Sequence, residues 1–212
     1  MNQGSASYNR ISSQSLERLA ALSDGVFAVA MTLLVLDLKG PAVELVHSDA
    51  DLRRALCTLF PKLLTYLMSF LTLGIFWAGQ QTQLNELKRS DRHLAWINLA
   101  YLFGMTLLPF STGLLADFIS YRSALLIYWL NILYPGVVLY ANWAYARRAG
   151  LVREETPLDF DRLARRRIVV AQALYGLGAA LCVFSNYWSI GFIVLVQLNF
   201  AIAPPLGRLS RI

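Results

Sequence analysis

Residues 18–38 read RLAALSDGVFAVAMTLLVLDL, and this stretch decides the fold that the sequence predicts. Between Asp24 and Leu36 it contains no charged residue, and Thr32 is its one polar side chain. A stretch of this length crosses the hydrocarbon core of a bilayer when it forms an α-helix. Arg18 and Asp24 stand at its start, where charged side chains are costly unless they find partners. This charged entrance to an apolar span therefore calls for a functional explanation.

The composition of the whole chain indicates a membrane protein. Of its 212 residues, 57% are hydrophobic and 15% are charged, and the mean hydropathy is +0.49. A soluble domain is about a quarter charged. The apolar residues form long runs, which predicts an all-α polytopic membrane protein. The net charge is +6, but the basic residues lie between these runs and form no aromatic-rich patch, so no nucleic-acid partner is expected.

The apolar runs predict six transmembrane helices in one domain over residues 16–207. A polar stretch over residues 1–15 is predicted to be a disordered cytoplasmic tail, and residues 208–212 a short cytoplasmic tail. The expected spans cover about 18–38, 56–79, 94–115, 122–145, 168–185 and 190–206.

The distribution of lysine and arginine predicts the orientation in the cell (inner) membrane. With both termini in the cytoplasm, 14 basic residues lie inside and five outside, which agrees with the positive-inside rule. The five are Lys39, Arg53, Arg54, Lys62 and Arg122.

No residue pattern indicates an enzyme, a metal site or a bound cofactor. The two histidines, His47 and His93, fall in predicted loops, and Cys57 and Cys182 have no C-x-x-C spacing. Polar residues inside the spans are therefore the candidates for function. Arg18 and Asp24 are six residues apart and cannot pair along one helix face, so each needs a partner from another span or subunit. At the same level of the membrane, the candidate partners are Trp77, Gln80, Gln81 and Asn98.

One stripe of the first span repeats every three or four residues, which places its members on one helix face. The stripe contains Leu22, Val26, Val29, Leu33 and Leu36, and Thr32 lies beside it. Small residues on a neighbouring face, Ala21, Gly25 and Ala28, suit close approach to another helix. From the spacing alone, ordinary packing or lipid contact is the better explanation of the stripe, because a stripe can be drawn on any side of a helix that is apolar all round.

Three motifs give the chain a resemblance to a known family. The pattern R-x-x-x-L-S-D-G-V-F-A-V-A-x-T-L-L-V-L starts at Arg18, YLMSFLTLGIFW covers residues 66–77, and Asn98 precedes LLPFST at residues 107–112. Together they resemble the transmembrane-protein-175 family of potassium channels, in its bacterial single-repeat branch. Beyond about residue 115, the resemblance is one of hydropathy only.

The resemblance implies a homotetramer in which the first helix of each subunit lines a central pore for K⁺ ions. Apolar rings of this helix form the constriction in the family, and they fall here on Val29, Leu33 and Leu36. The resemblance assigns cation preference to Thr32. It also implies an inter-helix polar network of Arg18, Ser23, Asp24, Trp77, Gln80, Gln81 and Asn98. The implied function is a passive channel, modestly selective for potassium over sodium, whose apolar rings act as gate and filter.

Two departures from the family pattern affect these expectations. Family members often carry histidine after the tryptophan of the second span, where this chain has Gln80 and Gln81. Glutamine cannot change its charge between about pH 5 and 8, so pH sensitivity through this position is not expected. Val29 is smaller than the isoleucine or leucine common at the main constriction, which favours a slightly wider gate.

Two other functions remain open from the residues. A secondary transporter would use helices broken at Pro109 and at Pro135-Gly136 to build a site at the membrane midplane. A non-conducting adaptor would act through the hydrophilic loop over residues 147–167.

Overall fold

The computed structural model describes the backbone of residues 3–202 and the side chains of residues 16–202 other than 37, 45 and 158. The described chain is all-α. The helices in chain order are α1 (Gln3–Leu33), α2 (Asp49–Thr58), α3 (Phe60–Asn85), α4 (Arg92–Thr106), α5 (Leu108–Asp117), α6 (Arg122–Arg148), α7 (Leu158–Ala180) and α8 (Asn186–Ile202). Short 3₁₀ turns follow α1 (Leu34–Asp37 and Val43–Leu45) and α7 (Leu181–Val183).

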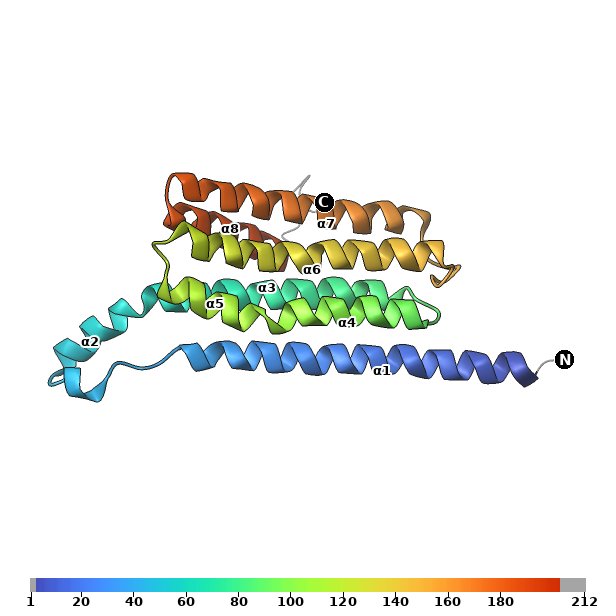
Figure 1. Cartoon of the computed structure of the whole chain (residues 1–212), viewed down its shortest axis with the longest axis horizontal. Helices are drawn as coiled ribbons and strands as arrows, with labels where there is room; N and C mark the ends of the chain where they lie inside the picture. Colours follow the sequence, from blue (N-terminus) through green and yellow to red (C-terminus); the bar gives the residue numbers. More distant parts are fainter. Residues whose placement is uncertain (1–2, 203–212) are drawn as a thin grey trace.

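The helices form a bundle in which α1 occupies one edge (Figure 1). It packs against α3, α4 and α5, while α6, α7 and α8 lie on the far side of these helices. Helix α2 projects away from the bundle, and the N-terminal part of α1 extends beyond it. Since α1 has neighbours on one side only, the subunit leaves its outer side uncovered.

Five segments are long and apolar enough to cross a membrane. They are Leu16–Leu36, Phe60–Asn85, Arg92–Asp117, Arg122–Arg148 and Asp159–Val183. The sixth predicted span corresponds to α8, a shorter apolar helix of 17 residues. The all-α prediction is therefore confirmed, with five to six candidate spans.

The structure differs from the predicted boundaries at three places. Helix α1 is helical from Gln3, where a disordered tail was expected, because a polar segment without proline can extend a helix that the apolar span has already nucleated. The second span starts at Phe60 and not at residue 56, since Pro61 lies in its first turn and cannot continue the bonding of α2. Helix α7 starts at Leu158, inside the expected hydrophilic loop. Residues 203–212, with the predicted C-terminal tail, lie outside the described residues.

The break between α4 and α5 falls at Leu107, two residues before Pro109. The side-chain amide of Asn131, with its oxygen facing α5, lies 3.2 Å from the N–H of Leu108 and 3.2 Å from the carbonyl of Gly104. It thereby pairs with backbone groups that lose their helical hydrogen bonds at the break, so these groups need no partner from outside the subunit. Pro135 lies inside a continuous α6.

A buried polar cluster, built mainly from hydroxyl groups, joins α3, α5, α6 and α8. Thr72 and Ser69 lie 3.1 and 3.2 Å from the hydroxyl of Tyr128, Gln197 donates to Thr72 at 2.7 Å, and Thr112 donates to Ser69 at 2.7 Å. These bonds fix the register of helices that would otherwise meet through apolar contacts only.

The contact between α7 and α8 depends on a glycine. A Cβ atom at Gly178 would lie 2.7 Å from Ile193, whereas one at Gly191 would meet no atom within 4 Å. We predict that Gly178→Ala destabilises the protein by about 1–3 kcal/mol through overpacking. Gly191→Ala is the control, and it should be neutral or stabilising by up to about 1 kcal/mol because alanine favours the helix. Thermal unfolding in detergent measures both, and equal melting temperatures would contradict this account of the packing.

Candidate functional site

Helix α1 has one buried face and one exposed face. The buried side chains recur every three or four residues and belong to Leu19, Ser23, Phe27, Ala30 and Leu34. They contact the rest of the bundle, and the ring of Phe27 lies 6.2 Å from that of Tyr101 on α4. This face holds the helix in the subunit.

The exposed face carries the predicted constriction residues. The exposed fractions of Leu22, Val29, Leu33 and Leu36 are 47%, 57%, 43% and 65%. An apolar groove runs along this face from Ala21 to Leu33, with Thr106 of α4 at its rim. A subunit alone thus leaves a long apolar stripe of α1 without protein contacts.

The hydroxyl of Thr32 lies on the same exposed face. It donates a hydrogen bond of 2.8 Å to the backbone carbonyl of Val29. Because its proton is held by the helix, the oxygen presents its free lone pairs outward. An oxygen in this state can accept a hydrogen bond or contact a cation.

Behind the buried face, a chain of hydrogen bonds anchors α1 to α3 and α4. Gln80 on α3 donates to Ser23 at 3.1 Å and to Asn98 on α4 at 3.0 Å, and Ser23 donates to the carbonyl of Leu19 at 2.9 Å. The exposed fractions of Ser23, Gln80 and Asn98 are 1% or less. The structure therefore brings these three predicted residues together in one buried site.

Two residues that the sequence reasoning missed extend this chain to α6. Asn98 donates to Asn142 at 3.1 Å, and Asn142 in turn faces Gln83 at 3.5 Å. Asn142 interrupts an apolar span, and this signal could have identified it. Gln83 gave no such signal because it was assigned to a polar loop.

Asp24 has its own partners on α3. Its Oδ1 atom accepts from the indole N–H of Trp77 at 2.8 Å and from the amide of Gln81 at 2.6 Å. These two hydrogen bonds join α1 to α3 at the start of the apolar span. All the predicted network residues except Arg18 are thus in hydrogen-bond contact with another member.

Arg18 is not part of the network within the subunit. Its side chain is exposed, and among the described residues it forms no ion pair or hydrogen bond. Spacings of four and seven residues place it on the same helix face as Leu22, Val29 and Leu36. Arg18 therefore lies at one end of the uncovered stripe.

The described residues hold no group of three or more His, Cys, Asp or Glu side chains able to bind a metal ion. The polar side chains that join the helices of the site are amides, one hydroxyl, one indole and one carboxylate. What the arrangement offers chemically is a rigidly held helix with an apolar outer face.

Comparisons with known proteins agree with this architecture. The sequence model of the family described as "Endosomal/lysosomal potassium channel TMEM175" matches residues 18–109. A potassium channel of Streptomyces collinus is 32% identical over 170 residues, which cover 78% of this chain and 80% of that protein. A potassium channel of Chamaesiphon minutus is 30% identical over 190 residues, which cover 87% and 93%.

A solved structure is similar to this chain over most of its length. The crystal structure of a lysosomal potassium-selective channel TMEM175 homolog from Chamaesiphon minutus matches with a TM-score of 0.76 at 27% identity, and the match covers 89% of this chain and 97% of that one. The chain is thus a multi-pass membrane protein of the ion-channel class and not an enzyme. It belongs to the TMEM175 family of potassium channels.

The buried network makes a prediction about stability. Asn98→Ala removes one of the two acceptors of the Gln80 amide and leaves the Oδ1 atom of Asn142 without a partner, so it should cost about 2 kcal/mol or more. Asn85→Ala, at the exposed end of α3, is the matched control and should change little. Melting temperatures in detergent check the pair, and an unchanged value for Asn98→Ala would show that the network does not hold α1.

Proposed function

We propose that this protein conducts K⁺ passively through a pore that four copies of α1 line at the centre of a homotetramer. The observation that carries the proposal is the uncovered apolar stripe of α1. Hydrogen bonds on the other face of the helix hold α1 in its subunit, so the stripe stays turned outward. Family membership supports the choice of ion, since the relatives from Streptomyces collinus and Chamaesiphon minutus are potassium channels.

Neighbouring copies of α1 can approach one another closely. Ala21 and Ala28 are exposed beside the stripe, and a Cβ atom at Gly25 would meet no atom within 4 Å. Small residues spaced in this way let helix backbones pack tightly inside a membrane. Four such helices around one axis would turn Val29, Leu33 and Leu36 toward the centre as successive apolar rings.

Apolar rings gate ions by controlling water. A narrow ring dewets and excludes a hydrated ion, whereas a slightly wider ring admits an ion that sheds part of its hydration shell. Potassium loses water at a smaller cost than sodium, so the rings select modestly for it. The outward oxygen of Thr32, one turn from Val29, would supply a dipole where water is removed.

The proposed orientation has both termini in the cytoplasm. It follows from the excess of lysine and arginine in the segments assigned to that side. In this orientation Arg18 and the network at Asp24 lie at the cytoplasmic end of the pore, and α2 lies outside the cell.

The activity itself is tested by flux. Purified protein in liposomes should pass K⁺ down its gradient about threefold or more faster than Na⁺ down an equal gradient, because the rings filter by dehydration. The measurement is the collapse of a potassium or sodium gradient, followed with a fluorescent reporter of membrane potential. Empty liposomes are the control, and the absence of flux for both ions would contradict a passive pore.

The constriction is tested by two valines of equal exposure. Val29 on α1 and Val137 on α6 are each 57% exposed in the subunit. Val29→Asn should keep its ring wet, raise the K⁺ flux and lower the preference over Na⁺. Val137→Asn lies on α6, away from the proposed pore helix, and should leave both unchanged. If both variants conduct like the unmodified protein, Val29 does not form the gate.

The glutamines after Trp77 predict how flux depends on pH. Since neither Gln80 nor Gln81 titrates, K⁺ flux should change less than about twofold between about pH 5.5 and 8. In Gln81→His, an imidazole faces Asp24 and gains charge at the acidic end of this range, so a pH dependence should appear. A strong pH dependence in the unmodified protein would show that another group controls the pore.

A further inference from the structure

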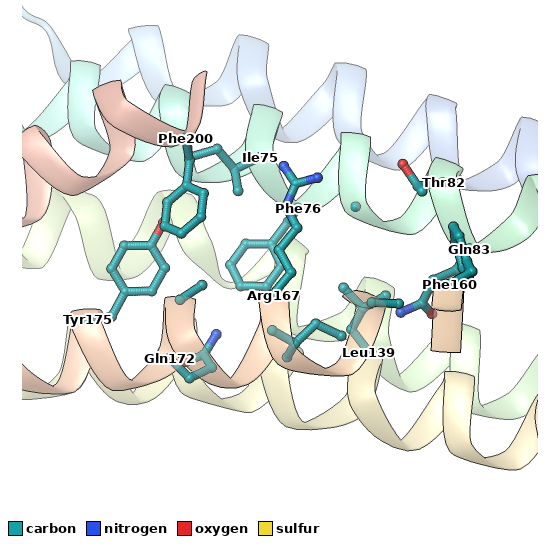
Figure 2. A pocket seen from close by; sticks show the side chains of 14 residues that line it. Ile75, Phe76, Thr82, Gln83, Leu139, Phe160, Arg167, Gln172, Tyr175 and Phe200 are labelled. Carbon is teal, nitrogen blue, oxygen red and sulfur yellow. The ribbon is translucent and has the colours of Figure 1, made fainter. Parts of the chain in front are cut away.

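A pocket of about 80 Å³ lies between α3, α6 and α7, away from α1. Figure 2 shows side chains of α7, among them Gln172 and Tyr175, facing Ile75 and Phe76 of α3. Phe200 of α8 closes one end, and Arg167 and Phe160 of α7 contribute to the lining. Most of the remaining lining is apolar, and the pocket is partly open to the outside of the bundle.

Two buried polar atoms in this pocket lack a partner. The hydroxyl of Tyr175 and the Oε1 atom of Gln172 make no hydrogen bond within the described part of the chain. Tyr175 is only 1% exposed, and Gly136 leaves the space into which the Gln172 amide fits. A buried hydroxyl without a partner costs about 1–3 kcal/mol, so its retention at a pocket indicates a ligand that supplies the missing partner.

Arg167 gives the pocket a positive charge at one side. It ends the run Arg165-Arg166-Arg167, in which Arg165 forms an ion pair of 3.1 Å with Asp161. Arg147 contacts the same carboxylate at 3.7 Å. Arg167 forms no ion pair or hydrogen bond with any residue whose side chain the structure describes. Its guanidinium is therefore available to an anion at the pocket.

We infer that this pocket binds an anionic phospholipid, with its phosphate on Arg167 and part of one acyl chain against the apolar walls. Guanidinium binds phosphate through paired hydrogen bonds, and the buried chain gains the hydrophobic contribution of its methylene groups. The Tyr175 hydroxyl can donate to an ester carbonyl, and Gln172 Oε1 can accept from a headgroup hydroxyl. These contacts satisfy both unpartnered atoms.

The position of the pocket in the membrane agrees with this occupant. The pocket lies toward the arginine-rich end of α7 and the C-terminal half of α3, which the positive-inside distribution places at the cytoplasmic leaflet. Basic pockets between transmembrane helices on this side bind anionic headgroups. A soluble anion would contact the same arginine but would leave the apolar walls and Tyr175 unused.

Native mass spectrometry of the purified full-length protein tests the site. Phosphatidylglycerol and phosphatidylcholine with identical acyl chains are added in turn, and the bound lipid is counted. The unmodified protein should retain phosphatidylglycerol about fivefold better, because its headgroup has a net negative charge for the free arginine, whereas the choline cation of phosphatidylcholine balances the charge of its phosphate. Arg167→Gln should abolish this preference, and Arg166→Gln, which removes the same charge outside the pocket, should preserve it. Equal binding of both lipids, or equal loss in both variants, would overturn the proposal.

A second pair of variants tests the acyl-chain contact. Ala171→Leu fills the pocket from α7, whereas Ala173→Leu places the same side chain on an exposed position of the same helix outside it. Ala171→Leu should displace the bound phosphatidylglycerol, and Ala173→Leu should retain it. Unchanged retention in Ala171→Leu, with normal size-exclusion behaviour, would show that the chain lies elsewhere. Neither pair alters α1, so failure here would leave the conduction proposal intact.

Discussion

The hydrogen bonds from Gln80 to Ser23 and Asn98 are the interaction on which the rest of the subunit depends. Inside a membrane, apolar contact between helices gives little more than contact with lipid, so polar side chains decide which helices meet and in which register. Gln80 of α3 donates to Ser23 of α1 and to Asn98 of α4, and Asn98 donates in turn to Asn142 of α6. Together with the bonds of Asp24 to Trp77 and Gln81, this chain fixes the rotation of α1 about its axis at the edge of the bundle.

Because the rotation of α1 is fixed, one face of the helix packs in the bundle and the other stays exposed. The network and the ring of Phe27 lie on the side toward the bundle, and Val29, Leu33 and Thr32 consequently lie on the other side. A gate made of valine and leucine rings tolerates little rotational error, because its width depends on which side chains point to the axis. In the proposed pore, the polar anchor is therefore a requirement of the gate and not a separate feature.

The sequence predicted the helices better than it predicted the partners within them. A long apolar run in lipid satisfies its backbone groups by forming a helix, which explains why the all-α fold could be predicted. The start of α3 was placed four residues too early, because α2 and α3 are both helical on either side of Leu59. Gln80, Asn98 and Asp24 were expected to meet because polar groups at one level of a membrane seek one another. The α7 start at Leu158 was missed because its first turns are charged. Asn142 could have been identified as a polar residue in an apolar span, but its partner Asn98 could not, because one amide in a span does not reveal which neighbour it faces. The partner of Arg18 stays a prediction, since spacing fixes its helix face and one subunit leaves open a partner from another subunit.

The most direct test of the central claim is a cysteine scan of α1 in protein whose Cys57 and Cys182 are replaced by serine and alanine. Single cysteines at residues 27 to 36 are exposed to a charged, water-soluble thiol reagent while K⁺ flux through liposomes is recorded. If the uncovered face of α1 lines the ion pathway, reagent should block flux at Val29, Thr32, Leu33 and Leu36 and spare the buried Phe27, Ala30 and Leu34. Reaction without block along the uncovered face, or block at the buried positions, would contradict the account.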